Sequence, residues 1–483
     1  MPVPPYCWSV LSAIIAVIVA FPDAARAERL NVLLVTADDL GITLGCYGDH
    51  TIPTPQLDAL AASGVQFNNA WIAQASCSPS RSAMLTGLYP HTNGQYGLTN
   101  SGDFRMHAGM IERSMPTLLK QAGYRTAIAG KLHVGPEDEW TFDERIKISG
   151  GARDMQGVAA AAQKFLDAQN EPFFLMVNYS DPHVDRSPDT GQQGYFLQRV
   201  DGLPETLLTG KDVSPFPFQR IDHPQELERI AGYYNCVVRL DTGIGLLMQT
   251  LAATGHDDDT LVIFLGDHGP PFCRGKTTCY EGGLKVPFLV RWPGVTTPRL
   301  SEQLVSSVDI APTILDAADV DSPATFHGRS LRPILANDNA TWREYLGADF
   351  HFHGERNYFP RRALRDSRYK LIRNLIAGDR KAYVTVDADR AYQHSRDEKY
   401  AGTDVRETFD RALDPPEYEL YDLQNDPWEF HNLASDSAHA DTLKRMQSAL
   451  LEWQSDTNDP FRTRQNLAPL QSRAKGEVKP DGN

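Results

Sequence analysis

The chain has 483 residues, of which 41% are hydrophobic and 23% are charged. This balance is typical of a globular protein with one large domain or two, and it excludes disorder except at the ends. The formal net charge of -15 argues against nucleic acid or an anionic membrane surface as the main partner. An anionic ligand would need cationic side chains gathered at one place.

The first segment, residues 1–27, has the pattern of an export signal. An apolar run over residues 10–21 is followed by Ala25-Arg26-Ala27, which matches the A-x-A pattern of a cleavage site. Because the run is short for a membrane-spanning helix and no later run is long enough, we expect a cleaved signal and no membrane anchor. Cleavage near Ala27 would leave a periplasmic or secreted chain.

Signal cleavage would remove Cys7 and leave an odd number of cysteines, which raises the question of which thiol stays unpaired. Cys77 is our candidate. Cys273 and Cys279 are close enough in sequence for a disulfide within one loop, but they are equally well explained as two buried free thiols. The sequence leaves both alternatives open.

Cys77 begins the stretch Cys77-Ser78-Pro79-Ser80-Arg81, around which we interpret the rest of the chain. A short helix is predicted over residues 82–87, and Pro79 is suited to start it. Cys77 would then lie at a helix N-terminus, where unpaired amides favour an anion and Arg81 adds a permanent positive charge. A lone cysteine is more often a small buried hydrophobe, so this oxyanion site depends on the neighbours of Cys77.

Apolar runs that alternate with helical segments fill the chain up to about residue 345. The predicted strands cover residues 30–36, 124–129, 173–177, 260–265 and 286–291, and the predicted helices cover residues 56–63, 118–122, 158–168 and 226–251. This order predicts an α/β fold with a large mixed, mostly parallel sheet flanked by helices. Such sheets bind ligands beyond the carboxyl ends of their strands.

Polar residues follow four of these strands and form the candidate site. They are Asp38, Asp39, Lys131, His133, His183, Asp267 and His268. Since parallel strands end at one edge of a sheet, we expect these side chains to converge. The three aspartates and His268 form a mostly oxygen ligand set, which suits Ca²⁺ or Mg²⁺.

Three cations and two histidines complete this candidate site. Arg81, Lys131 and Lys276 are suited to bind a tetrahedral anion. His133 and His183 are suited to supply or remove protons. Taken singly, each is better explained as a surface charge or a structural histidine, so the hypothesis rests on their convergence.

After about residue 345 the chain becomes more charged and more aromatic. Strands over residues 369–372, 382–386 and 419–423 predict a smaller antiparallel sheet, and residues 440–453 predict a closing helix. We therefore divide the chain into a signal (1–27), a main domain (28–345), a C-terminal α+β subdomain (346–464) and a loose polar tail (465–483).

Cys77-Ser78-Pro79-Ser80-Arg81, followed by Leu85-Thr86-Gly87, resembles the signature of the formylglycine-dependent sulfatases, within the alkaline phosphatase superfamily. Further blocks resemble the family in the expected order, namely Asp38-Asp39, Gly130-Lys131-Leu132-His133, Asp267-His268-Gly269 and Gly275-Lys276-Thr277. The resemblance covers most of the mature chain and makes residues 28–345 the catalytic domain.

The resemblance implies that a maturation enzyme converts Cys77 to formylglycine, whose hydrate attacks sulfur. One divalent cation, Ca²⁺ in first place with Mg²⁺ as the alternative, would be held by Asp38, Asp39, the modified Cys77, Asp267 and His268. Arg81 and Lys131 would stabilise negative charge, His133 would lie near the hydrate, and His183 and Lys276 would contact the sulfate or its leaving atom. His268 stands where many members have Asn, although other sulfatases carry His.

Several stretches, among them His133-Val134-Gly135-Pro136-Glu137, resemble the heparan N-sulfatase branch of the family. That likeness implies a sulfated saccharide as substrate, with the N-sulfate of glucosamine as first candidate. Three alternatives stay open: an O-sulfatase acting on an algal or other sulfated polysaccharide, a phosphate or phosphonate ester hydrolase, and an inactive glycan-binding homologue. The sequence does not establish the oligomeric state.

Overall fold

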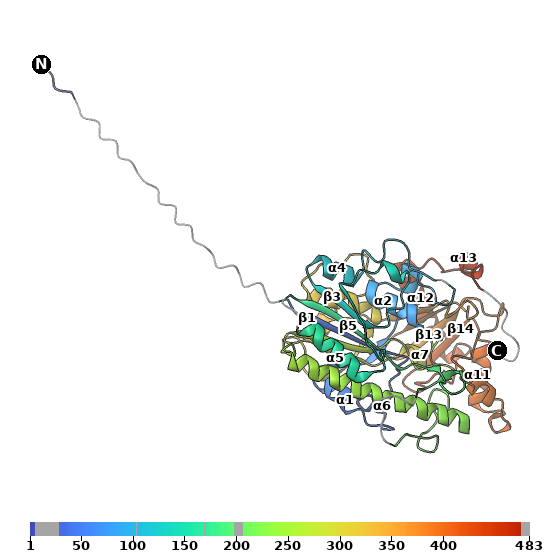
Figure 1. Ribbon diagram of the computed structural model, residues 1–483. Helices are drawn as coiled ribbons and strands as arrows, with labels where there is room; N and C mark the ends of the chain where they lie inside the picture. Colours follow the sequence, from blue (N-terminus) through green and yellow to red (C-terminus); the bar gives the residue numbers. More distant parts are fainter. Residues whose placement is uncertain (5–28, 103, 169–170, 198–205, 475–483) are drawn as a thin grey trace.

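The computed structural model describes residues 1–4, 29–102, 104–168, 171–197 and 206–474 (Figure 1). The predicted export signal lies outside these residues except for its first four, and so does the end of the predicted tail, residues 475–483. The boundaries of the predicted domains stay predictions.

The main sheet has eight strands in the order β10-β2-β9-β8-β1-β5-β3-β4 (Figure 1). Their bounds are β1 (Asn31–Asp38), β2 (Val65–Trp71), β3 (Arg125–Gly130), β4 (Glu144–Ile146), β5 (Phe173–Pro182), β8 (Thr260–Gly266), β9 (Phe288–Arg291) and β10 (Arg299–Ser306). Only β9 runs antiparallel to its neighbours β2 and β8, and the other pairs in this sheet are parallel. The predicted mixed, mostly parallel sheet is confirmed.

Helices cover both faces of this sheet. They include α1 (Pro55–Ala62), α2 (Cys77–Thr86), α4 (Met115–Gln121), α5 (Met155–Leu166), α6 (Pro224–Ala253) and α8 (Ile310–Ala317). In Figure 1, α1, α5 and α6 lie below the sheet, and α2 and α4 lie above it. The side chains of β1 alternate accordingly, because Leu33 and Val35 pack in one hydrophobic cluster while Val32 and Leu34 pack in another.

Helix α6 corrects one expectation, since among the described residues it is long and apolar enough to cross a membrane by length and composition. More than half of its apolar window is buried, and the helix packs against α1, α5 and β5. Ile230, Val237 and Leu240 are fully buried in that contact. Its apolar character is therefore explained by its place in the core.

A second, antiparallel sheet follows, in the order β11-β12-β13-β14. It consists of β11 (Leu346–Phe350), β12 (Arg361–Arg365), β13 (Tyr369–Asn374) and β14 (Tyr418–Asp422). Helix α12 (Ala440–Asp456) covers one face, where Met446 and Leu450 pack with Leu364 and Leu420. The smaller antiparallel sheet and its closing helix are thus confirmed.

The predicted strand over residues 382–386 is wrong. Ala382, Val384 and Val386 are buried alternately, as in a strand, but the segment pairs with no strand of the described chain. Its backbone bonds go elsewhere, since the Ala382 amide donates to Leu413 O at 2.7 Å and the Cys273 thiol donates to Val384 O at 2.8 Å. The period-two pattern records alternate burial in a segment outside both sheets.

Two further expectations are settled by the described residues. Part of the predicted loose tail is folded, because two helical turns, Arg464–Leu467 and Ala468–Gln471, bury Leu467 and Leu470 against Phe461. Cys273 and Cys279 are buried free thiols, so the disulfide alternative is wrong. Cys7 lies outside the described residues.

Candidate active site

Strand ends and one helix N-terminus bring the candidate residues together. Strand β1 pairs in parallel with both β5 and β8, so that Asp38 at its end lies near the residues that follow those strands. Helix α2 begins at Cys77, after the extended cap residue Ser76, and is buried along its whole length. The helix therefore starts at Cys77 itself, earlier than the predicted 82–87, and the expected place of Cys77 at a helix N-terminus is confirmed.

Four buried side chains converge on one point as a metal site would require. One ligand atom each of Asp38, Asp39, Cys77 and His268 lies within 4.8 Å of all the others. Cys77 Sγ is 3.3 Å from His268 Nε2 and 3.8 Å from Asp38 Oδ1. Asp39 Oδ1 lies 3.0 Å from Lys276 Nζ and 3.3 Å from His268 Nε2, so neighbouring positive charge stabilises this buried carboxylate.

The pKa of His268 reflects the negative charge that surrounds its ring. Burial alone would lower the pKa of His268, but Asp267, Cys77 and Asp39 together raise it to about 10. Nδ1 is bonded to Gly269 O, so Nε2 is the ring nitrogen that faces the cluster, and a metal ion bound there would take the place of a proton. A donor set that recruits positive charge in this way, with two carboxylates and an imidazole, fits a divalent cation.

Asp267 lies beside these four residues and is directed mainly toward Arg81. Its Oδ2 accepts from Arg81 Nε at 2.9 Å, and its Oδ1 accepts from the Asp39 amide at 3.0 Å. Oδ1 is also 3.7 Å from His268 Nε2. Asp267 thus orients both Arg81 and the Asp39 backbone, and its direct contact with a cation stays a prediction.

Three cations surround the cluster. Arg81 is fully buried, and the charges of Asp267 and Asp38 raise its pKa although burial opposes them. Lys131 Nζ donates to Asp38 Oδ2 at 2.7 Å, and that carboxylate outweighs burial to raise the pKa of Lys131 to about 12. All three predicted cations, Lys276 included, are therefore held charged at this edge of the sheet.

The two predicted proton-transfer histidines differ in environment. Burial, followed by the charge of Lys131, lowers the pKa of His133 to about 2, and neither of its ring nitrogens has a hydrogen-bond partner. His183 is partly exposed, with Nε2 lying 3.9 Å from Asp39 Oδ2 and Nδ1 bonded to Val184 O. The structure therefore places a neutral ring inside the cluster and a second ring at its edge.

Sequence reasoning missed two residues of the site, Asp387 and His353. Asp387 Oδ2 lies 2.8 Å from Lys276 Nζ, and His353 Nδ1 lies 2.9 Å from Ser76 Oγ, at the cap of α2. Asp387 directly follows the segment 382–386, as the other site residues follow strands, but that segment was assigned to the second sheet. For His353 we find no comparable signal in the sequence.

A cavity of about 480 Å³ borders this cluster, because its lining residues His183 and Asp387 lie next to Asp39 and Lys276. His183, His353, Asn357, Tyr383 and Asp387 contribute to its lining. The cavity offers amide, hydroxyl, imidazole and carboxylate groups at the entrance to a group of buried cations. That combination can hold a polar ring while the cations bind an attached anion.

Comparison with known proteins agrees with this chemistry. The sulfatase family model matches residues 30–320, and a model described as N-sulphoglucosamine sulphohydrolase, C-terminal, matches residues 266–414. The chain is 35% identical over 472 residues to N-sulphoglucosamine sulphohydrolase of Homo sapiens, covering 90% of this chain and 92% of that protein. It is 31% identical over 454 residues to an ulvan-active sulfatase of Formosa agariphila, covering 90% and 82% respectively.

Solved structures share the fold. A protein in complex with its substrate D-glucosamine-2-N,6-O-disulfate matches with a TM-score of 0.66 at 22% identity, over 90% of this chain and 99% of that one. Phosphonate monoester hydrolase of Agrobacterium radiobacter matches with a TM-score of 0.63 at 22% identity, over 89% and 96%. From the family match over residues 30–320 and the human relative, we conclude that the chain belongs to the sulfatase family and is a hydrolase similar to the heparan N-sulfatases.

Proposed function

We propose that this sulfatase hydrolyses sulfate from a saccharide, with the N-sulfate of glucosamine as its first substrate. The observation that carries the substrate class is the 35% identity to the human N-sulphoglucosamine sulphohydrolase along 90% of the chain. The cavity of about 480 Å³ supports it, since its polar lining suits a sugar ring. The buried cations beyond the cavity would receive the sulfate group.

Asp38, Asp39, His268 and the side chain derived from Cys77 would hold one divalent cation, with Ca²⁺ before Mg²⁺, and Asp267 would support them. The fit rests on their convergence within 4.8 Å and on the chemistry of the donor set, two carboxylates and an imidazole beside the Cys77 side chain. Such an ion supplies positive charge beside the reacting sulfate oxygen. We further propose that a formylglycine-generating enzyme matures Cys77, and the hydrated aldehyde supplies the nucleophilic oxygen.

The chain's own residues then bind the sulfate and move protons. Lys131 and Lys276 would bind sulfate oxygens, and Arg81 would orient Asp267 and the start of α2. His183 is suited to exchange a proton with the leaving nitrogen or oxygen at Nε2, because Nδ1 is bonded to Val184 O. His133, neutral and without hydrogen-bond partners, is free to bond to a hydroxyl of the hydrate.

Export is part of the proposal, on the strength of the apolar run at residues 10–21 and Ala25-Arg26-Ala27. Determining the N-terminus of the mature protein from the native host tests it. A mature chain that retains residue 1 would contradict signal cleavage. A chain that begins near residue 28 is the expected result.

Two observations favour second candidates for the substrate. The ulvan-active relative favours an O-sulfatase that acts on an algal polysaccharide. The phosphonate monoester hydrolase that shares the fold favours a phosphorus ester as substrate. A tetrahedral anion of either kind suits the same cations, so the choice lies with turnover measurements.

The test is a release screen with purified, matured enzyme on N-sulfoglucosamine, glucosamine 6-sulfate, an ulvan oligosaccharide and a phosphonate monoester. We expect sulfate release from N-sulfoglucosamine to be fastest. Cys77→Ala should abolish release with the fold intact, whereas Cys46→Ala, a half-buried cysteine outside the site, should not. Full activity in Cys77→Ala, or an unmodified Cys77 thiol by peptide mass spectrometry in active enzyme, would refute the mechanism.

A further inference from the structure

Lys276 enters the active site as part of an ion triad with two carboxylates. Its Nζ lies 3.0 Å from Asp39 Oδ1 and 2.8 Å from Asp387 Oδ2, and the side chain is 1% exposed. Asp39 belongs to the end of the main sheet, but Asp387 arrives from the segment between the strands of the second sheet. One part of the chain therefore supplies the cation and a distant part fixes one side of it.

Asp387 is ionised and faces the active-site cavity. Burial favours its neutral form, but the charge of Lys276 and the hydrogen bond that Lys276 donates hold the pKa of Asp387 well below its usual range. Its side chain is 24% exposed and lines the cavity of about 480 Å³ together with His183. Asp387 therefore contacts the buried Lys276 ammonium and also lines the cavity.

The backbone that delivers Asp387 has an unusual conformation. Asp387 and the next residue, Ala388, have φ angles of 49° and 67°, in the left-handed region that residues with a side chain rarely adopt. Gly194, at the hairpin strand β7 (Gln193–Tyr195), packs directly on this turn. A Cβ atom at Gly194 would lie 2.3 Å from Asp387 O and 2.6 Å from Ala388 Cβ, so only glycine fits there.

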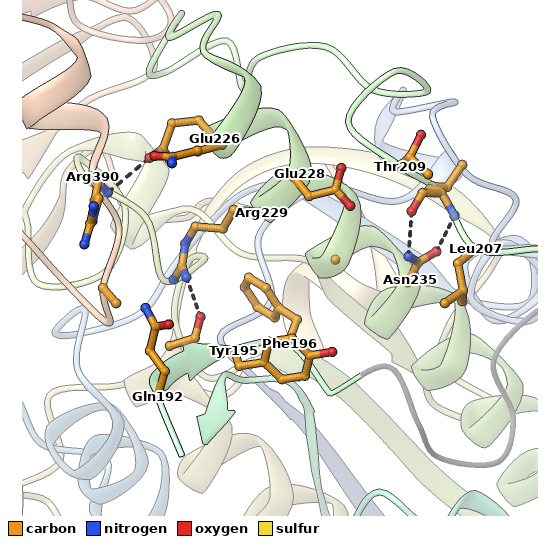
Figure 2. A pocket seen from close by; sticks show the side chains of 15 residues that line it. Gln192, Tyr195, Phe196, Leu207, Thr209, Glu226, Glu228, Arg229, Asn235 and Arg390 are labelled. Carbon is orange, nitrogen blue, oxygen red and sulfur yellow. Dashed lines mark hydrogen bonds between the residues drawn. The ribbon is translucent and has the colours of Figure 1, made fainter. Parts of the chain in front are cut away.

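Arg229 of α6 ties the same turn to the core. Its guanidinium donates to Gly194 O at 2.5 Å, to Asp387 O at 2.8 Å and to Pro271 O at 3.1 Å. The group also lies 5.1 Å from the ring centroids of both Phe196 and Phe272. Figure 2 shows the Arg229 side chain reaching from the helix to the strand that carries Tyr195. A rigid helix thus holds the backbone of Asp387 through one planar side chain.

We propose that Asp387 is a positioning residue for Lys276, and that Arg229 and Gly194 hold Asp387 in place. The inference rests on the proposed function, in which Lys276 binds a sulfate oxygen. With Asp387 neutralised, Lys276 retains only Asp39 and is free to turn toward it and away from the substrate. We expect kcat to fall, because a misplacement of a catalytic group by about 1 Å can slow the chemical step about 100-fold.

The experiment measures kcat and KM of matured enzyme with two substrates, N-sulfoglucosamine and a small aryl sulfate. For Asp387→Asn we expect kcat to fall about 100-fold with both substrates, and KM to change much less. Asp387→Glu should restore part of kcat, because it restores the charge. The exposed Asp379→Asn, in the same segment, is the control and should match wild type.

Gly194→Ala tests how Gly194 and Arg229 hold Asp387, and it changes no ionisable group. Because Gly194 also lines the cavity, the small aryl sulfate shows whether the loss is independent of sugar binding. The new methyl must displace the Asp387 carbonyl, so we expect kcat to fall about 10-fold with both substrates. The matched control is Gly191→Ala in the neighbouring turn, where φ is 68° but no atom lies within 4 Å of the added Cβ. That variant carries the backbone strain without the collision and should keep the wild-type kcat.

Each outcome decides the inference. Wild-type kcat in Asp387→Asn would overturn it, and so would a loss confined to the saccharide, which would make Asp387 a sugar-binding residue. If Asp387→Asn fails to fold, Asp387→Glu and Gly194→Ala decide.

If the wild type releases no sulfate at all, the proposed function fails separately. Inorganic sulfate should then still raise the unfolding temperature of the wild type more than that of Gly194→Ala, and an equal rise would overturn the positioning role.

Discussion

The molecule has two clusters of buried charged side chains. Each contains carboxylates and cations, but the two differ in how these groups are arranged. The first, which we call the catalytic cluster after its proposed role, contains the ligands Asp38, Asp39, Cys77 and His268 with the cations Lys131 and Lys276. The second, which we call the junction cluster, consists of Glu281, Arg365, Lys370 and Glu429, where the main sheet meets the antiparallel sheet. Lys370 Nζ lies 3.0 Å from Glu281 Oε1 and 2.6 Å from Glu429 Oε1, and 4.7 Å from the centroid of the Trp71 ring.

The clusters differ in which groups lie opposite their carboxylates. In the junction cluster each carboxylate faces a cation, and Lys370 and Arg365 lower the pKa of Glu281 to about 2 against the effect of burial. In the catalytic cluster Asp38 and Asp39 also have cationic partners, Lys131 and Lys276. One ligand atom of each aspartate nevertheless converges with Cys77 and His268 within 4.8 Å. Because carboxylates with cationic partners occur in both clusters, buried charge alone is a poor sign of function. Several potential metal ligands that converge on one point are a better sign.

The largest expected effect comes from Asp39→Asn, which removes a converging charge. We expect kcat/KM to fall by about 10³-fold to 10⁴-fold, since the change removes a cation ligand and a partner of Lys276. Sulfate release from N-sulfoglucosamine measures it. Glu281→Gln in the junction cluster is the comparison, and equal losses of activity per folded molecule in both variants would remove the distinction between the clusters.

Lys370→Met, in the junction cluster, should lower stability and leave activity unchanged, which is the opposite of the effect expected for Asp39→Asn. It leaves Glu281 and Glu429 buried without their shared cation, which costs about 3–5 kcal/mol of unfolding free energy. Urea unfolding measures the loss, and kcat of the folded fraction should be unchanged. The exposed pair of Arg464 and Asp379 gives the control, because Arg464→Met should cost no more than about 1 kcal/mol.

A divalent cation should stabilise only one of the two clusters. At a free Ca²⁺ concentration of about 100 times Kd, the wild type should gain about 2.7 kcal/mol of unfolding free energy. Lys370→Met should gain the same amount from its lower starting point, and Asp39→Asn should gain little. Thermal unfolding with Ca²⁺, Mg²⁺ and chelator measures this, and a gain in Asp39→Asn equal to that of wild type would place the ion elsewhere.

The catalytic cluster could be predicted from the sequence because its residues follow local patterns in the chain. Asp38 and Asp267 each follow a run of apolar residues, and such runs reveal buried parallel strands whose ends must meet. The helix at Cys77 was predicted five residues too late, because Ser78 and Ser80 are poor helix formers that tertiary packing buries here.

The rest of the site depends on contacts that no local pattern records. Asp387 reaches Lys276 through a segment whose alternating burial imitates a strand, and its turn is fixed by Gly194 and Arg229, far away in the sequence. The junction cluster is equally hidden, since Glu281 meets Lys370 only once the two sheets are packed together. Long-range packing of this kind follows from the whole fold and not from the residue pattern.

The smallest expected effect concerns His351, a buried histidine that stays neutral in the folded state. Burial lowers the pKa of His351 to about 3, although Asp349 opposes the shift, so the folded state keeps this ring neutral. Because the unfolded state binds a proton below about pH 6.5, stability should fall as the pH drops from there toward 3. At pH 5 the cost is about 2 kcal/mol.

His351→Gln should remove that part of the acid sensitivity, which urea unfolding at pH 7 and pH 5 would measure. The exposed His50→Gln is the control and should leave the difference between the two pH values unchanged. An unchanged difference in His351→Gln would mean that the ring finds a compensating anion, as His268 does. His351 would then resemble His268, whose pKa the surrounding carboxylates raise.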